Sequence, residues 1–448
     1  MNTETTEAQP NLKSLETIVS LAKRRGFVFP SSEIYGGFAS CYDYGPLGVE
    51  VKRNVKDAWW RSMVRLRDDV VGLDASILMH PRVWEASGHV GNFHDQLVEC
   101  KKCNLRIRVD KMDELDQIAT GASKNCKHEW SEPKNFDLMF KTHLGPVADS
   151  ANIVYLRPET AQGIFVNYAN ILDSTRVKIP FGVAQQGKSF RNEVTTRRFT
   201  FRTCEFEQME LEFFVKPDAG EEWFKYWREA RMQWFKDIGV SPARIRFRNH
   251  DSDELAHYSK ACTDIEYLFP FGWSEVEGIA WRGDYDLKQH SMYSKKQLDW
   301  KDQVTGESFV PHVVEPSIGV DRTILTLLCD AYKEEEVEGN TRVVMKFNPR
   351  IAPYKVAVFP LFKKDGHPEK ATQVYRMLQD RYMTVYDDGG SIGKRYRRQD
   401  EAGTPVCLTI DHQTIEDDTV TLRDRDTLEQ KRVKIDALLP TLSGLFGF

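Results

Sequence analysis

A chain of 448 residues with 41% hydrophobic and 11% aromatic residues can bury one large core and still build a second domain. Its formal net charge of −5 excludes a basic body, so a polyanionic partner would have to bind at local basic patches. The polar, acidic residues 1–10 and the lack of any long apolar stretch predict a cytosolic protein that does not enter a membrane. Eight scattered cysteines indicate reduced thiols rather than a disulfide framework.

The N-terminal part is predicted to be helical, with one short strand. Residues 1–11 are expected to be a disordered tail, and apolar residues then recur at helical spacing from Leu12 to Ala22. A second, amphipathic helix is predicted over Val49–Arg67. Ser76–Met79 is typical of a short strand, which Pro81 would stop.

The middle of the chain changes character twice. Residues 97–135 are charged and polar and contain a cysteine pair, which predicts an inserted subdomain. Apolar, strand-like runs return after residue 135, at Ile153–Leu156, Thr200–Phe214 and Val310–Val314. These runs, separated by turns and two helices, predict one mixed, mainly antiparallel body.

A separate small α/β domain is predicted beyond a proline-bearing linker at residues 349–353. The expected order is a strand over Lys355–Phe359, a helix over Glu369–Asp380, a basic helix, a strand over Val406–Ile410 and two further strands. The basic helix carries Lys394, Arg395, Tyr396, Arg397 and Arg398. It is either a solvated helix face or a surface that binds RNA.

The segment FRNEVTTRRFTFRTCEFEQMELE, residues 190–212, is the most informative part of the chain. Strand alternation places Met209, Leu211 and Phe213 on one face, and on the other Cys204, Phe206, Gln208, Glu210 and Glu212. A solvated sheet surface is the ordinary explanation for such acidic alternation. Arg191 lies at the mouth of the hairpin, however, where a guanidinium can bind a phosphate through two hydrogen bonds.

Three other segments repeat this mixture of carboxylates and arginines. YLRPETAQGIF holds Arg157, Glu159 and Thr160, and WSEVEGIAWRGDYDL holds Glu275, Val276 and Arg282. VVEPSIGVDR is predicted to be a strand that turns at Pro316 and Gly319 before a helix, and it holds Glu315, Ser317, Asp321 and Arg322. The set suits attack of a carboxylate on the α-phosphate of ATP, and the chain has no P-loop sequence for that purpose.

These segments resemble a known family. The FRNE hairpin, the predicted strand at Pro81 and the GVDR turn resemble the three signature motifs of class II aminoacyl-tRNA synthetases. SSEIYGGFASCYDYGPLG, HPRVWEASGHVGNF, RPETAQGIF, FRTCEFEQMELEFF, EPSIGVDR and SIGKRYRRQDEAGTP resemble the homodimeric glycyl-tRNA synthetases more narrowly. The resemblance extends from about residue 12 to 438.

The resemblance implies an α+β fold. It places an antiparallel-sheet catalytic domain at residues 12–348, with the insert at 97–135, and an α/β anticodon-binding domain at 353–448. It also implies a cytoplasmic homodimer that uses ATP with Mg²⁺ to form glycyl-adenylate, and that transfers glycine to the 3′ end of tRNA(Gly).

The resemblance further implies two adjoining binding sites. The ATP site would comprise Arg191, Asn192, Glu193, Phe201, Arg202, Thr203, Cys204, Glu205, Phe206, Glu275, Val276, Gly319, Val320, Asp321 and Arg322. The glycine site would comprise Arg108, Glu159, Phe206, Glu207, Gln208, Met209, Glu210, Arg282, Glu315, Pro316, Ser317, Ile318 and Gly319.

Individual roles follow from the same resemblance. Arg191 and Arg322 would be catalytic, the first on the α-phosphate and the glycine carboxylate, the second on the far phosphates. Phe206 would stack under adenine. The glycine ammonium would be surrounded by Glu159, Glu210, Glu315 and Ser317. Glu193 and Glu275 are neighbouring carboxylates that could organise Mg²⁺.

Such a pocket accounts for selectivity by exclusion. Carboxylates crowded around the ammonium leave no volume for a Cβ, so larger amino acids are rejected sterically and no editing domain is needed. Discrimination against a substrate smaller by one methylene contributes only about 1–3 kcal/mol, so exclusion is most effective for the smallest amino acid.

Two questions stay open at this level. Cys100, Cys103, Cys126 and His128 could hold tetrahedral zinc, or the insert could be metal-free. In many relatives the second pair is another Cys-x-x-Cys, which this sequence lacks. The chain could also be an inactive accessory subunit that binds nucleic acid, but such a protein should have lost Arg191, Glu210, Glu315 or Arg322, and all four are present.

Overall fold

The computed structural model describes residues 13–446 apart from 39, 120, 147–151, 194–197, 252, 257–258 and 303–304. The predicted tail at 1–11 and most of the loop after the FRNE sequence therefore lie outside the described residues. The first described helix, α1 (Leu15–Arg25), confirms the predicted entry helix. Ser14 caps its N-terminus by accepting from the Thr17 N–H, and Gly26 ends it in the left-handed conformation.

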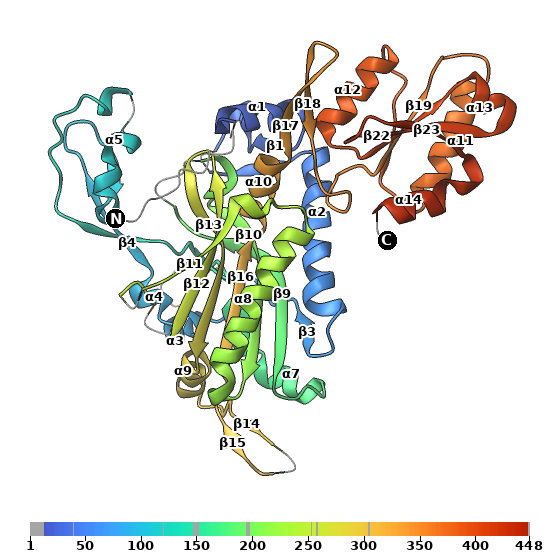
Figure 1. The fold of residues 1–448 in the computed structure, drawn as a ribbon. Coiled ribbons are helices and arrows are strands. Elements are labelled where there is room, and N and C mark those ends of the chain that lie inside the picture. Colours follow the sequence, from blue (N-terminus) through green and yellow to red (C-terminus); the bar gives the residue numbers. More distant parts are fainter. Residues whose placement is uncertain are drawn as a thin grey trace, which may run out of the picture.

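A seven-stranded sheet forms the centre of the molecule (Figure 1). Its order is β11 (Ile245–Asn249), β12 (Ala261–Phe269), β13 (Gly272–Gly283), β16 (His312–Gly319), β10 (Glu205–Val215), β9 (Phe181–Phe190) and β3 (Val70–Leu73). All neighbours pair antiparallel except β3 and β9. The predicted mainly antiparallel body is therefore confirmed.

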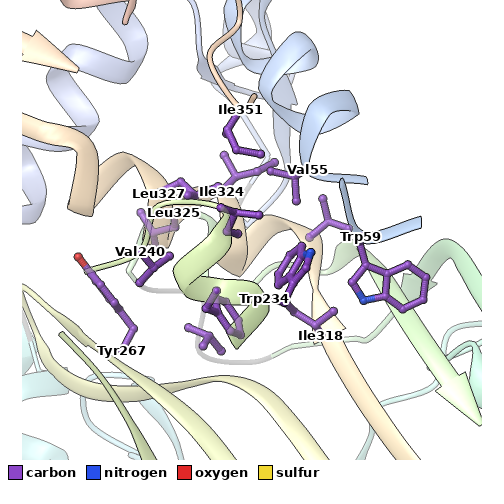
Figure 2. Packing of buried hydrophobic residues seen from close by; sticks show 14 of the residues in the cluster. Val55, Trp59, Trp234, Val240, Tyr267, Ile318, Ile324, Leu325, Leu327 and Ile351 are labelled. Carbon is purple, nitrogen blue, oxygen red and sulfur yellow. The ribbon is translucent and has the colours of Figure 1, made fainter. Parts of the chain in front are cut away.

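Three helices cover one face of this sheet. They are α2 (Pro46–Trp60), which continues as a π-helical turn over Arg61–Arg65, α8 (Gly220–Asp237) and α10 (Val320–Ala331). Figure 2 shows Trp59 of α2, Trp234 of α8 and Ile324 of α10 packed together with Ile318 of β16. Met209, Leu211 and Phe213 of β10 belong to this core, as strand alternation predicts.

The opposite face of the sheet is divided into two halves. One half is apolar and is packed by α6 (Ala161–Val166), α7 (Tyr168–Ser174) and α9 (Tyr285–Ser294) around Phe181 and Phe214. The other half carries the polar residues of β10, and among the described residues no apolar cluster packs against it. A hairpin of β7 (Lys141–His143) and β8 (Ile153–Tyr155) leads the chain into α6. Smaller hairpins are β1 (Val28–Pro30) with β2 (Tyr42–Tyr44), and β14 (Trp300–Lys301) with β15 (Ser308–Phe309).

Two predictions about proline are wrong. Ser76–Met79 is not a strand, and Pro81 begins a helix, α3 (Pro81–Ala86), where its fixed φ and missing N–H suit the first turn. A short helix, α4 (His89–Asn92), follows. Pro316 does not turn the chain but lies inside β16, opposite Ile279 of β13. The ladder to β10 is interrupted there, because proline donates no hydrogen bond.

The predicted insert has a small sheet of its own, in the order β5 (Arg106–Arg108), β4 (His94–Glu99) and β6 (Lys134–Asp137). A short helix, α5 (Leu115–Ile118), packs beside it. Figure 1 shows this unit projecting from the side of the body that holds the seven-stranded sheet.

The C-terminal unit confirms the predicted α/β rhythm. Its sheet order is β20 (Thr384–Tyr386), β19 (Val356–Pro360), β21 (Val406–Ile410), β22 (Thr419–Asp424) and β23 (Gln430–Lys434). Its helices are α11 (His367–Gln379), α12 (Ile392–Ala402), α13 (His412–Asp417) and α14 (Leu438–Phe446). None of the helices in the described ranges has the length and apolar character needed to cross a membrane.

A hairpin of β17 (Tyr332–Val337) and β18 (Asn340–Met345) joins this unit to the body that holds the seven-stranded sheet. Arg342 of β18 is fully buried and forms a two-bond ion pair with Asp400 of α12, at 2.8 Å in each bond. Arg423 of β22 also donates to Asp400. The Arg342–Asp400 pair thus links the hairpin to α12 through a buried charge whose partner could not be removed without cost.

Candidate functional site

A cavity of about 160 Å³ opens over the polar half of the sheet. It is formed by the turn after β9, the start of β10, the middle of β13 and the junction of β16 with α10. Its lining residues are Arg191, Glu193, Thr200, Phe201, Arg202, Thr203, Phe206, Gln208, Glu275, Ser317, Gly319, Asp321 and Arg322. All except Thr200 are residues that the sequence places in the candidate site.

The Arg191 side chain is held in this cavity by backbone and aromatic contacts. The backbone N–H of Arg191 donates to the Cys204 carbonyl at 2.9 Å, and the side-chain Nε donates to the Pro158 carbonyl at 3.0 Å. The guanidinium lies over the rings of Phe93 and Phe206, 5.4 and 5.3 Å from their centroids. No described residue accepts from its two terminal nitrogens. A guanidinium fixed in this way is prepared to bind an anion.

Arg322 occupies the first turn of α10, on the other side of the cavity. Its Nε donates to the Phe201 carbonyl at 3.1 Å, and its Nη1 lies 3.2 Å from Oε1 of Glu275. The charge of Arg322, opposed by burial, holds the pKa of Glu275 below its ordinary value. Arg202 pairs with Glu193 at 3.4 Å nearby.

Three arginines and the carboxylates of Glu193 and Glu275 therefore share the outer part of the cavity. Guanidinium groups bind phosphate oxygens, and carboxylate oxygens are the ligands that Mg²⁺ prefers. This end of the cavity is suited to a polyphosphate with a bound divalent cation.

An acidic inner cluster adjoins the cavity, with Glu210 at its centre: Glu210 does not line the cavity, but it contacts the lining residues Gln208 and Ser317. Glu210 is 2% exposed, and its Oε1 accepts from the Ser317 hydroxyl at 2.6 Å and from Nε2 of Gln208 at 2.9 Å. Its Oε2 accepts from the N–H of Thr160 at 3.0 Å and from the Thr160 hydroxyl. Burial and repulsion from Glu159 nevertheless raise the pKa of Glu210.

Arg282 is the buried cation of this region. It makes two bonds to Asp286, at 2.8 and 2.9 Å, and one to Glu315 at 2.8 Å. Burial, only partly offset by Arg282, raises the pKa of Glu315 to about 8. Glu212 is fully buried, neither of its oxygens has a partner among the described residues, and burial and repulsion from Glu315 raise its pKa well above the ordinary range.

Glu159 completes the acidic group from the start of α6. Its Oε1 accepts from Nε2 of Gln162 at 3.0 Å, and its Oε2 lies 3.3 Å from Nε2 of His89. Burial acts to raise the pKa of Glu159, but the charges of His89 and Arg282 outweigh it and the pKa is lowered.

The inner cluster has more acids than bases. Three basic side chains of the described residues, Arg282, His89 and Arg157, interact with a group of five carboxyls, those of Glu159, Glu210, Glu212, Glu315 and Asp286. Burial, and to a smaller extent repulsion between neighbouring carboxylates, raises the pKa of Glu210, Glu212 and Glu315, so a further cation would favour their ionised forms. The cluster can therefore bind a small cation such as an ammonium group.

Several predicted site residues do not reach the cavity with their side chains. Val276, Ile318 and Val320 are core residues, as is Met209. Glu207 lies on the α2 side of β10, where it pairs with Lys52 at 2.8 Å and with Lys56. The other predicted residues that do not line the cavity are Asn192, Cys204, Glu205 and Pro316, together with Glu159, Glu210, Arg282 and Glu315 of the buried acidic cluster.

Two charged side chains that were predicted to bind substrate already form hydrogen bonds or ion pairs with other residues of the protein. Asp321 accepts from the Tyr44 hydroxyl at 2.5 Å and from the Glu207 N–H at 2.8 Å. Arg108 pairs with Asp95 at 3.2 Å and with Asp110, within the insert, and it does not line the cavity.

Sequence reasoning missed five residues of the site, which are Thr200, His89, Gln162, Glu212 and Asp286; Glu212 was placed on the polar face of the strand but not in either predicted site. His89 and Gln162 lie inside HPRVWEASGHVGNF and RPETAQGIF, which carry the resemblance, so those segments contained the signal. Arg282 lies at the end of β13 and Asp286 in the first turn of α9, so this pair forms across a strand-to-helix turn that no sequence pattern indicated.

Arg157 and Arg395 have structural roles. Arg157 is buried and donates to the backbone carbonyls of Lys188 and Ala75, at 2.6 and 2.8 Å. Arg395 of the basic helix α12 is also buried, and donates to the carbonyls of Asp388 and Gly390. The helix face predicted from composition is therefore less basic on its outside than the sequence suggests.

Comparison with known proteins agrees with this geometry. Residues 140–331 match the tRNA synthetase class II core domain (G, H, P, S and T), and residues 355–445 match an anticodon binding domain. A glycine--tRNA ligase of Borreliella burgdorferi is 55% identical over 433 residues, which cover 95% of this chain and 96% of that protein.

Two further glycine--tRNA ligases match over nearly their whole length. That of Treponema denticola is 54% identical over 426 residues, covering 94% of each chain. That of Acetivibrio thermocellus is 51% identical over 462 aligned positions, covering 97% of this chain and 99% of that protein. With its class II core and anticodon-binding domain, this chain belongs to the glycine--tRNA ligase family of class II aminoacyl-tRNA synthetases.

Proposed function

We propose that this enzyme activates glycine with ATP and transfers the glycyl group to the 3′ end of tRNA(Gly). The observation that carries this proposal is the buried acidic cluster that adjoins an arginine-lined cavity through Gln208 and Ser317. An amino acid has one ammonium and one carboxylate, and a substrate with its ammonium among Glu159, Glu210 and Glu315 would present its carboxylate toward the arginines.

The first step needs positioning and charge stabilisation. The glycine carboxylate attacks the α-phosphorus of ATP, the bond to the β-phosphate oxygen breaks, and pyrophosphate leaves as glycyl-adenylate forms. Arg191 would stabilise the charge that develops on the α-phosphate, and Arg322 would hold the departing phosphates. Phe206 would stack on adenine. Glu193 and Glu275 would hold Mg²⁺, which neutralises phosphate charge when bound.

Glycine-dependent exchange of pyrophosphate into ATP tests this proposal. We expect exchange with glycine, and values of kcat/KM for alanine and serine that are lower by about a hundredfold or more, because a Cβ would have to enter the packed carboxyl cluster. If alanine or serine supports exchange as well as glycine does, steric exclusion is wrong. If no amino acid supports exchange, the alternative of an inactive nucleic-acid-binding subunit is favoured.

The pH dependence of glycine binding should report on Glu315. The pKa of Glu315 is about 8 in the free site, so this carboxyl is protonated below that pH. The glycine ammonium favours the ionised carboxylate. Binding of glycine below about pH 8 therefore releases a proton from Glu315. The KM for glycine should therefore fall as pH rises toward about 8, by up to about tenfold per pH unit. Exchange rates at saturating ATP measure this slope. Glu315→Gln should flatten the profile, and an unchanged slope in that variant would exclude Glu315 as the titrating group.

The remaining partners belong to the same proposal. The C-terminal unit would bind the anticodon, as its match to an anticodon binding domain suggests. The chain would act as a homodimer, since Ile34 and Tyr35, 89% and 87% exposed, form an apolar surface near Phe38 that a second copy could cover. We place the enzyme in the cytoplasm because all eight cysteines are free thiols, which persist in a reducing compartment.

A further inference from the structure

Four potential metal ligands converge in the insert, away from the cavity. Cys100 and Cys103 lie in the turn between β4 and β5, and Cys126 and His128 lie in the segment that leads to β6. Their ligand atoms all lie within 4.8 Å of one another. Two pairs that are separated in the sequence therefore meet at one point.

The distances between these atoms fit a tetrahedral zinc site. The sulfurs of Cys100 and Cys126 are 3.9 Å apart, and the sulfur of Cys103 is 3.6 Å from Nδ1 of His128. Zinc bonds of about 2.3 Å to sulfur and about 2.0 Å to nitrogen give tetrahedral edges of roughly 3.8 and 3.5 Å. A disulfide would instead require sulfurs about 2.05 Å apart.

The backbone around the cluster orients its ligands. Lys101 donates its N–H to the Glu129 carbonyl at 2.8 Å, and Cys100 forms an isolated β-bridge with Trp130, so the two ligand-bearing segments lie side by side. The Trp130 ring stacks on His128, with centroids 4.8 Å apart. Such outer contacts fix ligand orientation at metal centres.

The insert also lacks a core large enough to hold it together. Among the described residues of the insert, the buried apolar cluster comprises Val98, Ile107 and Ile118, with a few half-buried neighbours. Small units with so little buried apolar surface are usually stabilised by disulfides or by a structural metal. None of the eight cysteines forms a disulfide, so a structural metal is the remaining means of stabilising the insert.

We propose that Cys100, Cys103, Cys126 and His128 bind a structural Zn²⁺ that holds the insert in its folded form. Three thiolates and one imidazole, with no fifth ligand position required, are the ligands of a closed structural zinc site rather than a catalytic one. The Cys-x-His pair thus replaces the second Cys-x-x-Cys, with histidine as the fourth ligand.

The insert contacts the catalytic site at its base. The N–H of Asn192, next to Arg191, donates to the Leu138 carbonyl at 2.8 Å, directly after β6. Phe93, directly before β4, lies against the Arg191 guanidinium. Loss of the metal should therefore disturb the turn that carries Arg191 as well as the insert.

Elemental analysis of the full-length enzyme, expressed in zinc-supplemented medium, tests the site directly. We expect about one zinc per chain in the wild type and less than about a tenth of that in Cys126→Ser and His128→Ala. Cys41→Ser, which changes a cysteine outside the cluster, should keep the full zinc content. A zinc-free wild type, or full zinc in both ligand variants, would overturn the proposal.

A second measurement uses the wild-type protein, so it does not require that any variant fold. Titration of the wild type with a mercurial thiol reagent, in the presence of a zinc-sensitive dye, should release about one zinc per chain as the cluster thiols react. Substitution by Co²⁺ should give the strong visible bands of tetrahedral cobalt thiolate, and these bands should be lost in Cys126→Ser. Octahedral, weakly coloured cobalt in the wild type would contradict a tetrahedral site.

Discussion

Replacing Arg191 by alanine is expected to lower glycine-dependent pyrophosphate exchange by about a thousandfold or more, because one preorganised cation at a developing phosphate charge contributes on this scale. The guanidinium is held by the Pro158 carbonyl and by the rings of Phe93 and Phe206, and its terminal nitrogens have no partner among the described residues. Their removal should cost catalysis rather than folding. Arg191→Lys should recover only part of the activity, since an ammonium keeps the charge but not the paired hydrogen bonds.

Two controls separate catalysis from folding in this experiment. Arg176→Ala removes an exposed arginine that does not line the cavity and should behave as the wild type. Arg191→Ala should keep the wild-type Tm and the wild-type mass in solution, which we propose to be that of a dimer. Exchange by Arg191→Ala at the wild-type rate would refute the proposed role.

Replacing Glu210 by glutamine should lower kcat/KM for glycine by about a hundredfold, since breaking a buried, hydrogen-bonded charge pair costs about 2–5 kcal/mol. The KM for ATP should change little, because Glu210 lies among Thr160, Gln208 and Ser317 rather than beside the arginines. Initial rates of exchange with glycine and ATP varied separately measure both constants.

Stability should respond to two opposing effects. Burial and repulsion from Glu159 raise the pKa of Glu210, so a neutral amide removes an unfavourable charge, but its NH2 group cannot accept the hydrogen bonds that Thr160 or Gln208 donates, and Tm should change by only a few degrees. The surface variant Glu221→Gln, which removes only an exposed pair with Lys225, should match the wild type in rate and Tm. A much lower Tm for Glu210→Gln with an unchanged glycine KM would assign Glu210 a structural role instead.

Local patterns in the sequence were reliable where the periodicity of a strand or helix decided the outcome. Alternation along β10 separates Phe206, Gln208 and Glu210 from the core residues Met209 and Leu211 in the structure, as it does in the sequence. The C-terminal rhythm of strands and helices was predictable for the same reason. Each of these features depends on contacts between near neighbours and on one buried face.

Proline was the main source of local error. Pro81 and Pro316 both disfavour a regular strand by themselves, yet one begins α3 and the other lies within a central strand of the sheet. Local propensity could not decide Pro81, because proline suits both the end of a strand and the first turn of a helix. At Pro316 the packing of the whole sheet outweighs the loss of one hydrogen bond.

The sequence by itself determined the family, the two-part architecture and most of the residues that line the cavity. Only the tertiary structure decided which charges are used within the fold and which face the cavity. Arg157, Arg395 and Glu207 are occupied by partners inside the protein, whereas Arg191 faces the cavity. The pairing of Glu159 with His89 and of Glu315 with Arg282 joins residues far apart in the chain. The local sequence around a carboxylate is the same whether the carboxylate pairs with a lysine inside the protein or faces a pocket. Its role is therefore set by long-range packing and by the charges that this packing brings close to it.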